Sequence, residues 1–564
     1  PGADGLCTPE EPIVYYLDPG TPEPVRSALL DGARWWAEAF EAAGFRDAYR
    51  VAMLPEGADP MDVRYNVIQW VHRSTRGWSY GSSVTDPRTG EILKGHVTLG
   101  SLRVRQDYLL AEGLLAPYEG DNAGGFPPGD DPMLAMALAR IRQLSAHEVG
   151  HTLGLAHNFA ASVNGRASVM DYPAPLATVK DGRISLEGAY DAGIGEWDKV
   201  AIRYGYAEPA EGQSEAALLE GIVRDYRAAG LYYITDADAR PGGAAHPLAN
   251  LSDNGENAVE ALARGMRVRA VALDRFDASV VRTGRPMALM EEVLVPLYLR
   301  HRYQIDAAAK TLGGVTYTYA LRGDGAPSPA PVAAEEQEAA LEALLATLTP
   351  EALRLPLAAR TQIAPRPPGY PSTRELFPGH TGLTFDPYAP AAVVATMAFD
   401  ALVHPERAAR LVYQNDYDAA LPALDDVLAR TTAAVWQAPV AGDGYDAELQ
   451  RTVQQVWADA LLEQAANREA APAVRARITR HLRDLRAWLQ ENPGRTGETQ
   501  AHRAYVRDAI DRFLGRPYDA GARPAGLAIP PGSPIGQRGP AYLERQKRRR
   551  ALLDRWTPRL ACTW

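Results

Sequence analysis

The sequence predicts an α+β protein, in which a domain with a mixed β-sheet and one long helix is followed by a large, mainly α-helical region. Short β-branched and aromatic runs, typical of strands, occur in the first 130 residues. From residue 211 onward, apolar residues recur mainly with the spacing of helices. A chain of 564 residues is also longer than one hydrophobic core usually supports, so two or three domains are expected.

The pattern changes along the chain at positions that predict the domain boundaries. We place the sheet-containing domain at residues 10–208 and a first helical region at residues 209–360. Residues 361–390 are rich in Pro and Gly and show little periodicity, which indicates a linker or a loop wrapped over a neighbour. A C-terminal helical region is expected at residues 391–564.

The first domain contains the expected sheet. Strands are predicted at residues 13–17, 66–72, 80–85 and 92–99. Residues 22–43 carry helical spacing and end at Gly44. The segment Asp-Pro-Arg-Thr-Gly at 86–90 is typical of a hairpin turn between the last two strands, so the sheet is expected to be mixed or antiparallel at one edge.

Further helices follow from the apolar spacing. They are predicted at residues 195–204, 216–229, 258–271, 286–303, 335–348, 391–413, 419–436, 446–466, 473–491 and 498–514. No fixed repeat period indicates a solenoid.

Composition limits the partners. Apolar residues make up 46% and charged residues 23% of the chain, which is typical of a folded globular protein. The net charge of -11 argues against nucleic acid as a partner. No apolar stretch reaches the roughly 18 to 20 residues that cross a bilayer, so no membrane span is expected. The basic run at residues 545–550 is interpreted as the solvated face of a helix, with binding to nucleic acid or acidic lipid as the alternative.

One helix carries the residues with clear chemistry. Asp131 can cap it and Pro132 can occupy its first turn, and it is expected to run to about Leu153. His147 and His151 are four residues apart and lie on one face, so both imidazoles can reach one metal ion.

The residues around this pair predict a catalytic zinc site. Glu148 stands next to the first histidine and can take a proton from water without being a ligand. Gly154 can adopt positive φ and turn the chain back, so that His157 becomes the third ligand. The fourth position of one Zn²⁺ ion then stays open for water, as in catalytic rather than structural sites.

The segment Ser168-Val169-Met170-Asp171-Tyr172 follows this motif and resembles the Met-turn of metzincin zinc peptidases. The resemblance implies that Met170 forms an apolar floor beneath the three imidazoles. In the astacin and serralysin branches, a Tyr two residues after the Met reaches the zinc or the oxyanion. Tyr172 has that spacing and is a candidate fifth ligand or transition-state donor.

Other stretches are similar to a poorly characterised family of large bacterial zinc-dependent metalloproteases, whose metzincin domain precedes a C-terminal helical region. They are residues 86–92, 158–159, 168–173, 198–206 and 301–314. The resemblance implies a metzincin-like catalytic domain and a zinc-dependent endopeptidase acting on proteins or peptides. Because family members are usually longer at the N-terminus, a processed or truncated form is expected, and no signal peptide is visible at Pro1. An extracellular, periplasmic or cell-envelope location is expected from the resemblance.

The implied mechanism assigns a role to each site residue. Zinc polarises the scissile carbonyl, Glu148 moves the proton from water to the leaving amine, and Tyr172 stabilises the oxyanion. Substrate is expected to add as a strand along an edge strand at residues 92–100. Residues 173–176 are expected to form a wall of the pocket after the scissile bond.

Several alternatives stay open. A latent or non-catalytic binding protein on the same scaffold is the main one, and an interaction protein that works through its helical region is another. An aminopeptidase-like site would take a later Glu in place of His157. Cys7 and Cys562 can form a disulfide or remain two thiols, or Cys7 can cap the zinc in a latent form. Calcium is a further candidate, at Asp236, Asp238, Asp253, Asn254 and Asn257, although helix caps and turns also explain these residues.

Overall fold

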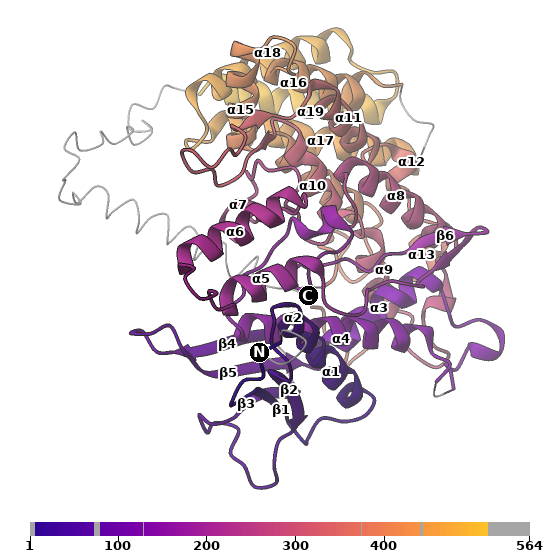
Figure 1. Ribbon diagram of the computed structural model, residues 1–564. Coiled ribbons are helices and arrows are strands. Elements are labelled where there is room, and N and C mark those ends of the chain that lie inside the picture. The colour runs from indigo at the N-terminus through magenta and orange to yellow at the C-terminus, as the bar shows by residue number, and fades with distance from the viewer. Residues whose placement is uncertain (1–5, 73–78, 128, 374, 440–443, 517–564) are drawn as a thin grey trace.

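The computed structural model describes residues 6–72, 79–127, 129–373, 375–439 and 444–516. A β-sheet lies at one end of the molecule and a large group of helices at the other, as Figure 1 shows. The predicted α+β fold, with a mixed sheet followed by many helices, is confirmed.

The sheet has five strands in the order β2-β1-β3-β5-β4. They are β1 (Ile13–Leu17), β2 (Tyr49–Met53), β3 (Asn66–Val71), β4 (Tyr80–Thr85) and β5 (Ile92–Gly100). The first three and β5 are parallel, and β4 pairs antiparallel with β5 through the predicted hairpin. Two smaller hairpins follow, formed by β6 (Thr178–Lys180) with β7 (Arg183–Ser185) and by β8 (Val315–Thr316) with β9 (Ala330–Pro331).

The prediction that residues 92–100 form the edge strand is wrong. β5 has hydrogen-bonded neighbours on both sides, and β4 is the edge. The burial of the two strands agrees with this order, since Val97 and Leu99 of β5 are fully buried whereas β4 is mostly exposed. A strand buried on both faces and paired at both edges is an interior strand.

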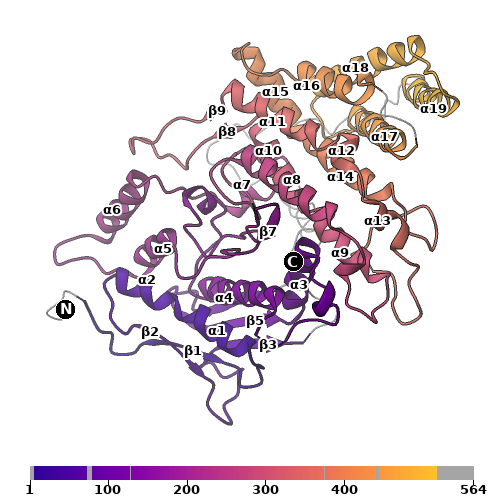
Figure 2. The same ribbon diagram turned by 90° about the vertical axis from the view of Figure 1, so that its right-hand side faces the viewer.

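Five helices belong to the sheet end of the molecule. They are α1 (Val25–Arg34), α2 (Trp36–Ala42), α3 (Leu102–Leu115), α4 (Pro132–Thr152) and α5 (Glu196–Tyr206). The helix predicted at residues 22–43 is two helices, because the N–H groups of Trp35 and Glu38 donate three residues back and tighten the chain there. Figure 2 shows α1 and α4 above the sheet. They approach closely: a Cβ on Gly32 would stand 1.9 Å from the Arg142 carbonyl oxygen.

The remaining helices form the second part of the molecule. They are α6 (Glu215–Ala228), α7 (Asp236–Ala239), α8 (Ala258–Asp274), α9 (Leu289–Tyr298), α10 (Arg302–Thr311), α11 (Ala334–Ala346), α12 (Pro350–Leu353), α13 (Leu357–Gln362), α14 (Ala389–Leu402), α15 (Pro405–Tyr417), α16 (Leu424–Thr432), α17 (Tyr445–Ala466), α18 (Pro472–Glu491) and α19 (Gly497–Leu514). A π-helical turn, Ala433–Gln437, extends α16. The segments 286–303 and 391–413, each predicted as one helix, are two helices each. The second segment is divided at His404, because a residue that precedes a proline is disfavoured in the helical conformation and His404 is extended.

One hydrophobic core runs through this helical part. It contains residues from both sides of the segment 361–390, for example Leu344 and Phe399. The division of the chain at residues 208, 360 and 390 stays a prediction. Cys562 and the basic run at 545–550 lie outside the described residues. Within the described ranges, no helix has both the length and the apolar character needed to cross a membrane.

Candidate metal centre

The long helix α4 carries three of the predicted site residues. Its first turn is capped by Asp131, which accepts hydrogen bonds from the N–H groups of Met133 (2.9 Å) and Leu134 (3.1 Å). At the other end, the Leu155 N–H donates to the Gly150 carbonyl at 3.0 Å, and Gly154 has a φ of +92°. This left-handed residue ends the helix and turns the chain back, as predicted.

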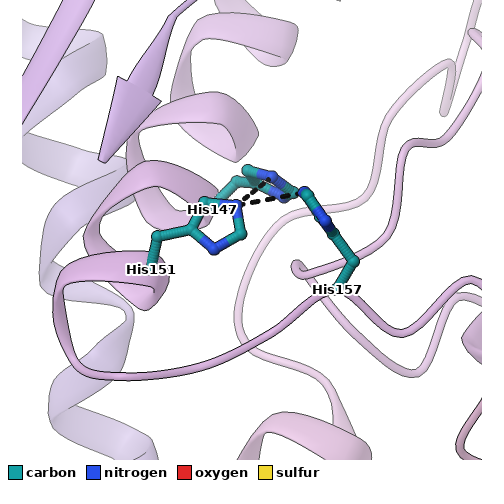
Figure 3. A group of neighbouring side chains, drawn as sticks. All are labelled: His147, His151 and His157. Atoms are coloured by element: carbon teal, nitrogen blue, oxygen red, sulfur yellow. Dashed lines mark hydrogen bonds between the residues drawn. The ribbon is translucent and has the colours of Figure 1, made fainter. Parts of the chain in front are cut away.

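The turn brings His157 opposite the two histidines of the helix (Figure 3). The Nε2 atom of His151 lies 3.1 Å from that of His147 and 3.1 Å from that of His157. Two nitrogens that bind one zinc ion tetrahedrally, each at about 2.0 to 2.1 Å, lie roughly 3.3 Å apart. The three imidazoles therefore fit one tetrahedral metal ion. In the described part of the chain, they are the one cluster of three or more His, Cys, Asp or Glu groups with such spacing.

Each of these imidazoles has an acceptor for its other ring nitrogen. Nδ1 of His147 donates to the Val169 carbonyl at 2.7 Å, and Nδ1 of His151 donates to the Leu155 carbonyl at 2.9 Å. Such bonds fix the tautomer that leaves Nε2 free to bind a metal. Burial lowers the pKa of His147 well below its usual range and that of His151 to about 4, so both are neutral near pH 7, as ligands must be.

The acceptor for His157 is Asp236, at the start of α7. Its carboxylate lies 3.0 Å from Nδ1 of His157 and accepts a second hydrogen bond, at 2.8 Å, from Nε of Arg240. Burial raises the pKa of Asp236, but His157 and Arg240 outweigh it and bring the pKa to about 2. Asp236 is thus an anion that orients the third imidazole. From the sequence, Asp236 was a candidate only for a calcium site.

Glu148 directly follows His147 in α4 and is 5% exposed. Burial raises its pKa to about 8, against the opposing effects of Arg140 and of a hydrogen bond from the Gly81 N–H. Gly81 belongs to the edge strand β4, and a Cβ on it would stand 2.1 Å from the Glu148 carbonyl oxygen. Only glycine permits β4 to lie this close to α4, so the edge of the sheet passes directly beside the Glu148 carboxyl.

Met170 lies beneath the helix segment that joins the ligands. It is fully buried, and a Cβ on Gly150 would stand 2.3 Å from its Sδ atom. The turn around it is held by Asp198 of α5, which accepts hydrogen bonds from the Ser168 hydroxyl (2.6 Å) and the Val169 N–H (2.8 Å). Asp198 was not among the site residues predicted from the sequence, although it lies in one of the stretches that carry the family resemblance.

Tyr172 packs against two of the histidines. Its ring centroid lies 5.1 Å from that of His147 and 4.7 Å from that of His157. Nη2 of Arg240 lies 3.5 Å from its hydroxyl oxygen and is a long hydrogen-bond donor to it. The same arginine thus contacts both Tyr172 and Asp236.

Two of the open alternatives receive no support. Cys7 pairs through its backbone with Phe45, its side chain is exposed, and it does not belong to the histidine cluster. The calcium candidates have other partners: Asp238 accepts from Tyr319, Asn254 donates to the Ala174 carbonyl, Asn257 caps α8, and Asp253 is buried near Asp171.

A cavity of about 110 Å³ opens beside Glu148 and Tyr172. Residues 173–177 line one side of it, and side chains of α3, α4 and α8 line the others. A volume of this size holds several water molecules or an amino-acid side chain.

Comparison with known proteins identifies one family. The sequence model of a family described as Met-zincin matches residues 129–442, more than half of the chain. No curated protein and no solved structure matches the chain.

Proposed function

The chain belongs to the Met-zincin family, and from this membership we propose that it is a zinc-dependent endopeptidase that hydrolyses peptide bonds of proteins or peptides. The observation that supports this function best is the convergence of three histidine Nε2 atoms at the end of the helix that also carries the buried carboxyl of Glu148. Three histidine ligands leave a fourth position open, which is the arrangement of catalytic zinc.

His147, His151 and His157 would hold the ion, because neutral imidazole nitrogens are ligands that Zn²⁺ prefers. When bound, zinc supplies a Lewis acid that polarises the scissile carbonyl and lowers the pKa of the attacking water. The protein fixes the three nitrogens in advance through the acceptors at their Nδ1 atoms. Met170, in the role of a Met-turn residue, supports the helix backbone under the ligands.

Glu148 acts as the general base. Its carboxylate accepts the proton of the attacking water and then transfers it to the nitrogen of the leaving amine. Burial raises the pKa of this carboxyl above that of an exposed glutamate, which makes it a stronger proton acceptor. The Gly81 N–H fixes the carboxylate beside the edge strand.

Tyr172 donates a hydrogen bond to the oxyanion of the tetrahedral intermediate. The packing of its ring against His147 and His157 limits its movement. Because Arg240 donates to the hydroxyl oxygen, the hydroxyl hydrogen points away from that cation. The substrate backbone adds as a strand beside β4, which replaces the predicted β5 in this role.

Cleavage of an unstructured protein such as casein by the parent and by Glu148→Gln tests the proposal. Glu112→Gln is the matched control, because Glu112 is also a partly buried carboxyl with a raised pKa but lies on α3 and binds Tyr118. Mass spectrometry of the products identifies internal cleavage. We expect the parent and Glu112→Gln to produce internal fragments and Glu148→Gln to produce none.

Bound zinc is counted in all three proteins. About one zinc in each, with cleavage lost only in Glu148→Gln, supports the peptidase with Glu148 as base. Zinc in all three without cleavage by any of them contradicts the peptidase and favours a non-catalytic protein on this scaffold.

A further inference from the structure

The cavity beside Glu148 is rich in arginine. Its lining includes Arg103 of α3, Arg140 of α4, Arg264 of α8, and Arg300 and Arg302 at the junction of α9 and α10. Among the described residues that line the cavity, Glu148 carries the one carboxylate. The walls of this cavity are therefore strongly cationic.

These arginines differ in what balances their charge. Arg103 forms a buried ion pair with Asp107 at 2.7 Å. Arg264 donates to the Asn254 carbonyl at 2.6 Å, and Arg300 donates to the Pro175 carbonyl at 2.7 Å. These two acceptors are neutral, so the hydrogen bonds position the guanidinium groups and leave their charge uncompensated.

Arg140 is the least satisfied of them. It is 5% exposed, and its Nε and Nη1 atoms have no hydrogen-bond partner. Burial lowers the pKa of Arg140 and lowers that of Arg300 to about 10. A guanidinium group stays protonated in proteins, so both are cations at neutral pH. The charges of Asp107 and Glu148 favour the cationic form of Arg140. Its two unbonded N–H groups are still costly to bury, and a carboxylate that enters the cavity can accept hydrogen bonds from them.

The position of the cavity identifies which substrate residue would enter. Glu148 must deliver its proton to the leaving nitrogen, so it faces the side of the scissile bond from which the amine departs. Glu148, Tyr172 and residues 173–177 all line this cavity. The side chain of the first residue after the scissile bond is therefore the one nearest its mouth.

We propose that this cavity is the pocket for the first residue after the scissile bond and that its arginines select a carboxylate there, from an Asp or Glu side chain. This inference rests on the proposed peptidase function. The free C-terminal carboxylate of a short peptide has the same chemistry, so the test must separate the two sources.

Four fluorogenic peptides with amidated C-termini, identical except for Glu, Gln, Leu or Lys after the scissile bond, test the preference. We expect kcat/KM for Glu to exceed that for Gln by about tenfold or more, because the two side chains differ mainly in charge. A companion Gln peptide that ends at this residue with a free carboxylate measures the other source. A preference found only for that peptide would overturn the side-chain assignment.

Variants of α8 and α4 connect the preference to the cavity. Arg264→Gln and Arg140→Gln are expected to lower the ratio of kcat/KM for the Glu peptide to kcat/KM for the Gln peptide severalfold. Arg267→Gln, an exposed arginine on the same helix α8 that does not line the cavity, should keep the parent ratio. The ratio does not depend on the amount of active enzyme, so partial misfolding of a variant cannot produce the result. Arg264→Glu should shift the preference from Glu towards Lys.

The outcomes separate the two proposals. Equal rates for Glu and Gln, a preference for Leu over Glu, or a ratio unchanged in both cavity variants would overturn the inference while leaving the peptidase intact. Cleavage of none of the peptides, together with intact casein, would overturn the peptidase and the inference with it.

Discussion

The carboxylate of Asp236 provides a sharp test of how the metal centre is built. Asp236→Asn keeps an amide oxygen that can accept from Nδ1 of His157 but removes the negative charge beside the imidazole and Arg240. Losing such an outer partner of a zinc ligand weakens zinc binding by roughly 10- to 100-fold, or about 1.4 to 2.7 kcal/mol. The Asp236 side chain is 42% exposed, so water replaces part of the interaction. We therefore expect a loss of about tenfold, at the low end of that range.

Zinc affinity is measured by titrating the metal-free protein in competition with a coloured chelator at neutral pH. Asp238→Asn is the matched control. It removes the same charge two residues along α7, where the carboxylate accepts from the Tyr319 hydroxyl at 2.6 Å instead of from a histidine of the metal centre. Unchanged zinc affinity in Asp236→Asn, or an equal loss in both variants, would refute the argument that Asp236 acts through His157.

The remaining predictions concern the turn, the floor and the oxyanion donor of the site. Gly150→Ala places a Cβ 2.3 Å from the Met170 sulfur, so denaturant unfolding should show a free energy of unfolding lower by about 1 to 3 kcal/mol. Gly205→Ala is the control: its Cβ meets open space, and the free energy of unfolding should rise by up to about 1 kcal/mol. Equal effects of the two substitutions would contradict the close contact. Burial raises the pKa of Asp198 to about 6, from 3.8, so its contribution to stability is complete below about pH 4 and is lost as the pH rises through 6. The unfolding free energy of the parent relative to Asp198→Asn should thus fall between those pH values, and a difference independent of pH would contradict this. Tyr172→Phe should lower kcat about 100-fold with zinc affinity retained; an unchanged kcat would exclude the hydroxyl from the oxyanion site.

Local sequence signals were sufficient to predict that the three histidines come together. The spacing of His147 and His151, the helix end at Gly154 and the return to His157 all depend on residues within one short segment. The Asp131 cap and the hairpin between β4 and β5 are equally local. Such features can be predicted from the sequence because they depend on the geometry of one helix or one turn.

Features that depend on distant segments could not be predicted. Asp236 lies 79 residues after His157, and no motif connects the two. Gly81 became informative only once β4 was known to lie against α4. The arginines of the cavity come from separate helices, and nothing in their spacing along the chain indicates that they line one space.

Reconstitution of the metal-free protein with zinc tests the central claim most directly. Peptidase activity is followed while zinc is added in small steps, and the amount bound is counted at each step. We expect activity to rise linearly and to stop rising at one zinc per chain. Glu148→Gln should bind the same single ion without becoming active. Activity in the metal-free protein, a requirement for more than one zinc, or full activity in Glu148→Gln would contradict the central claim.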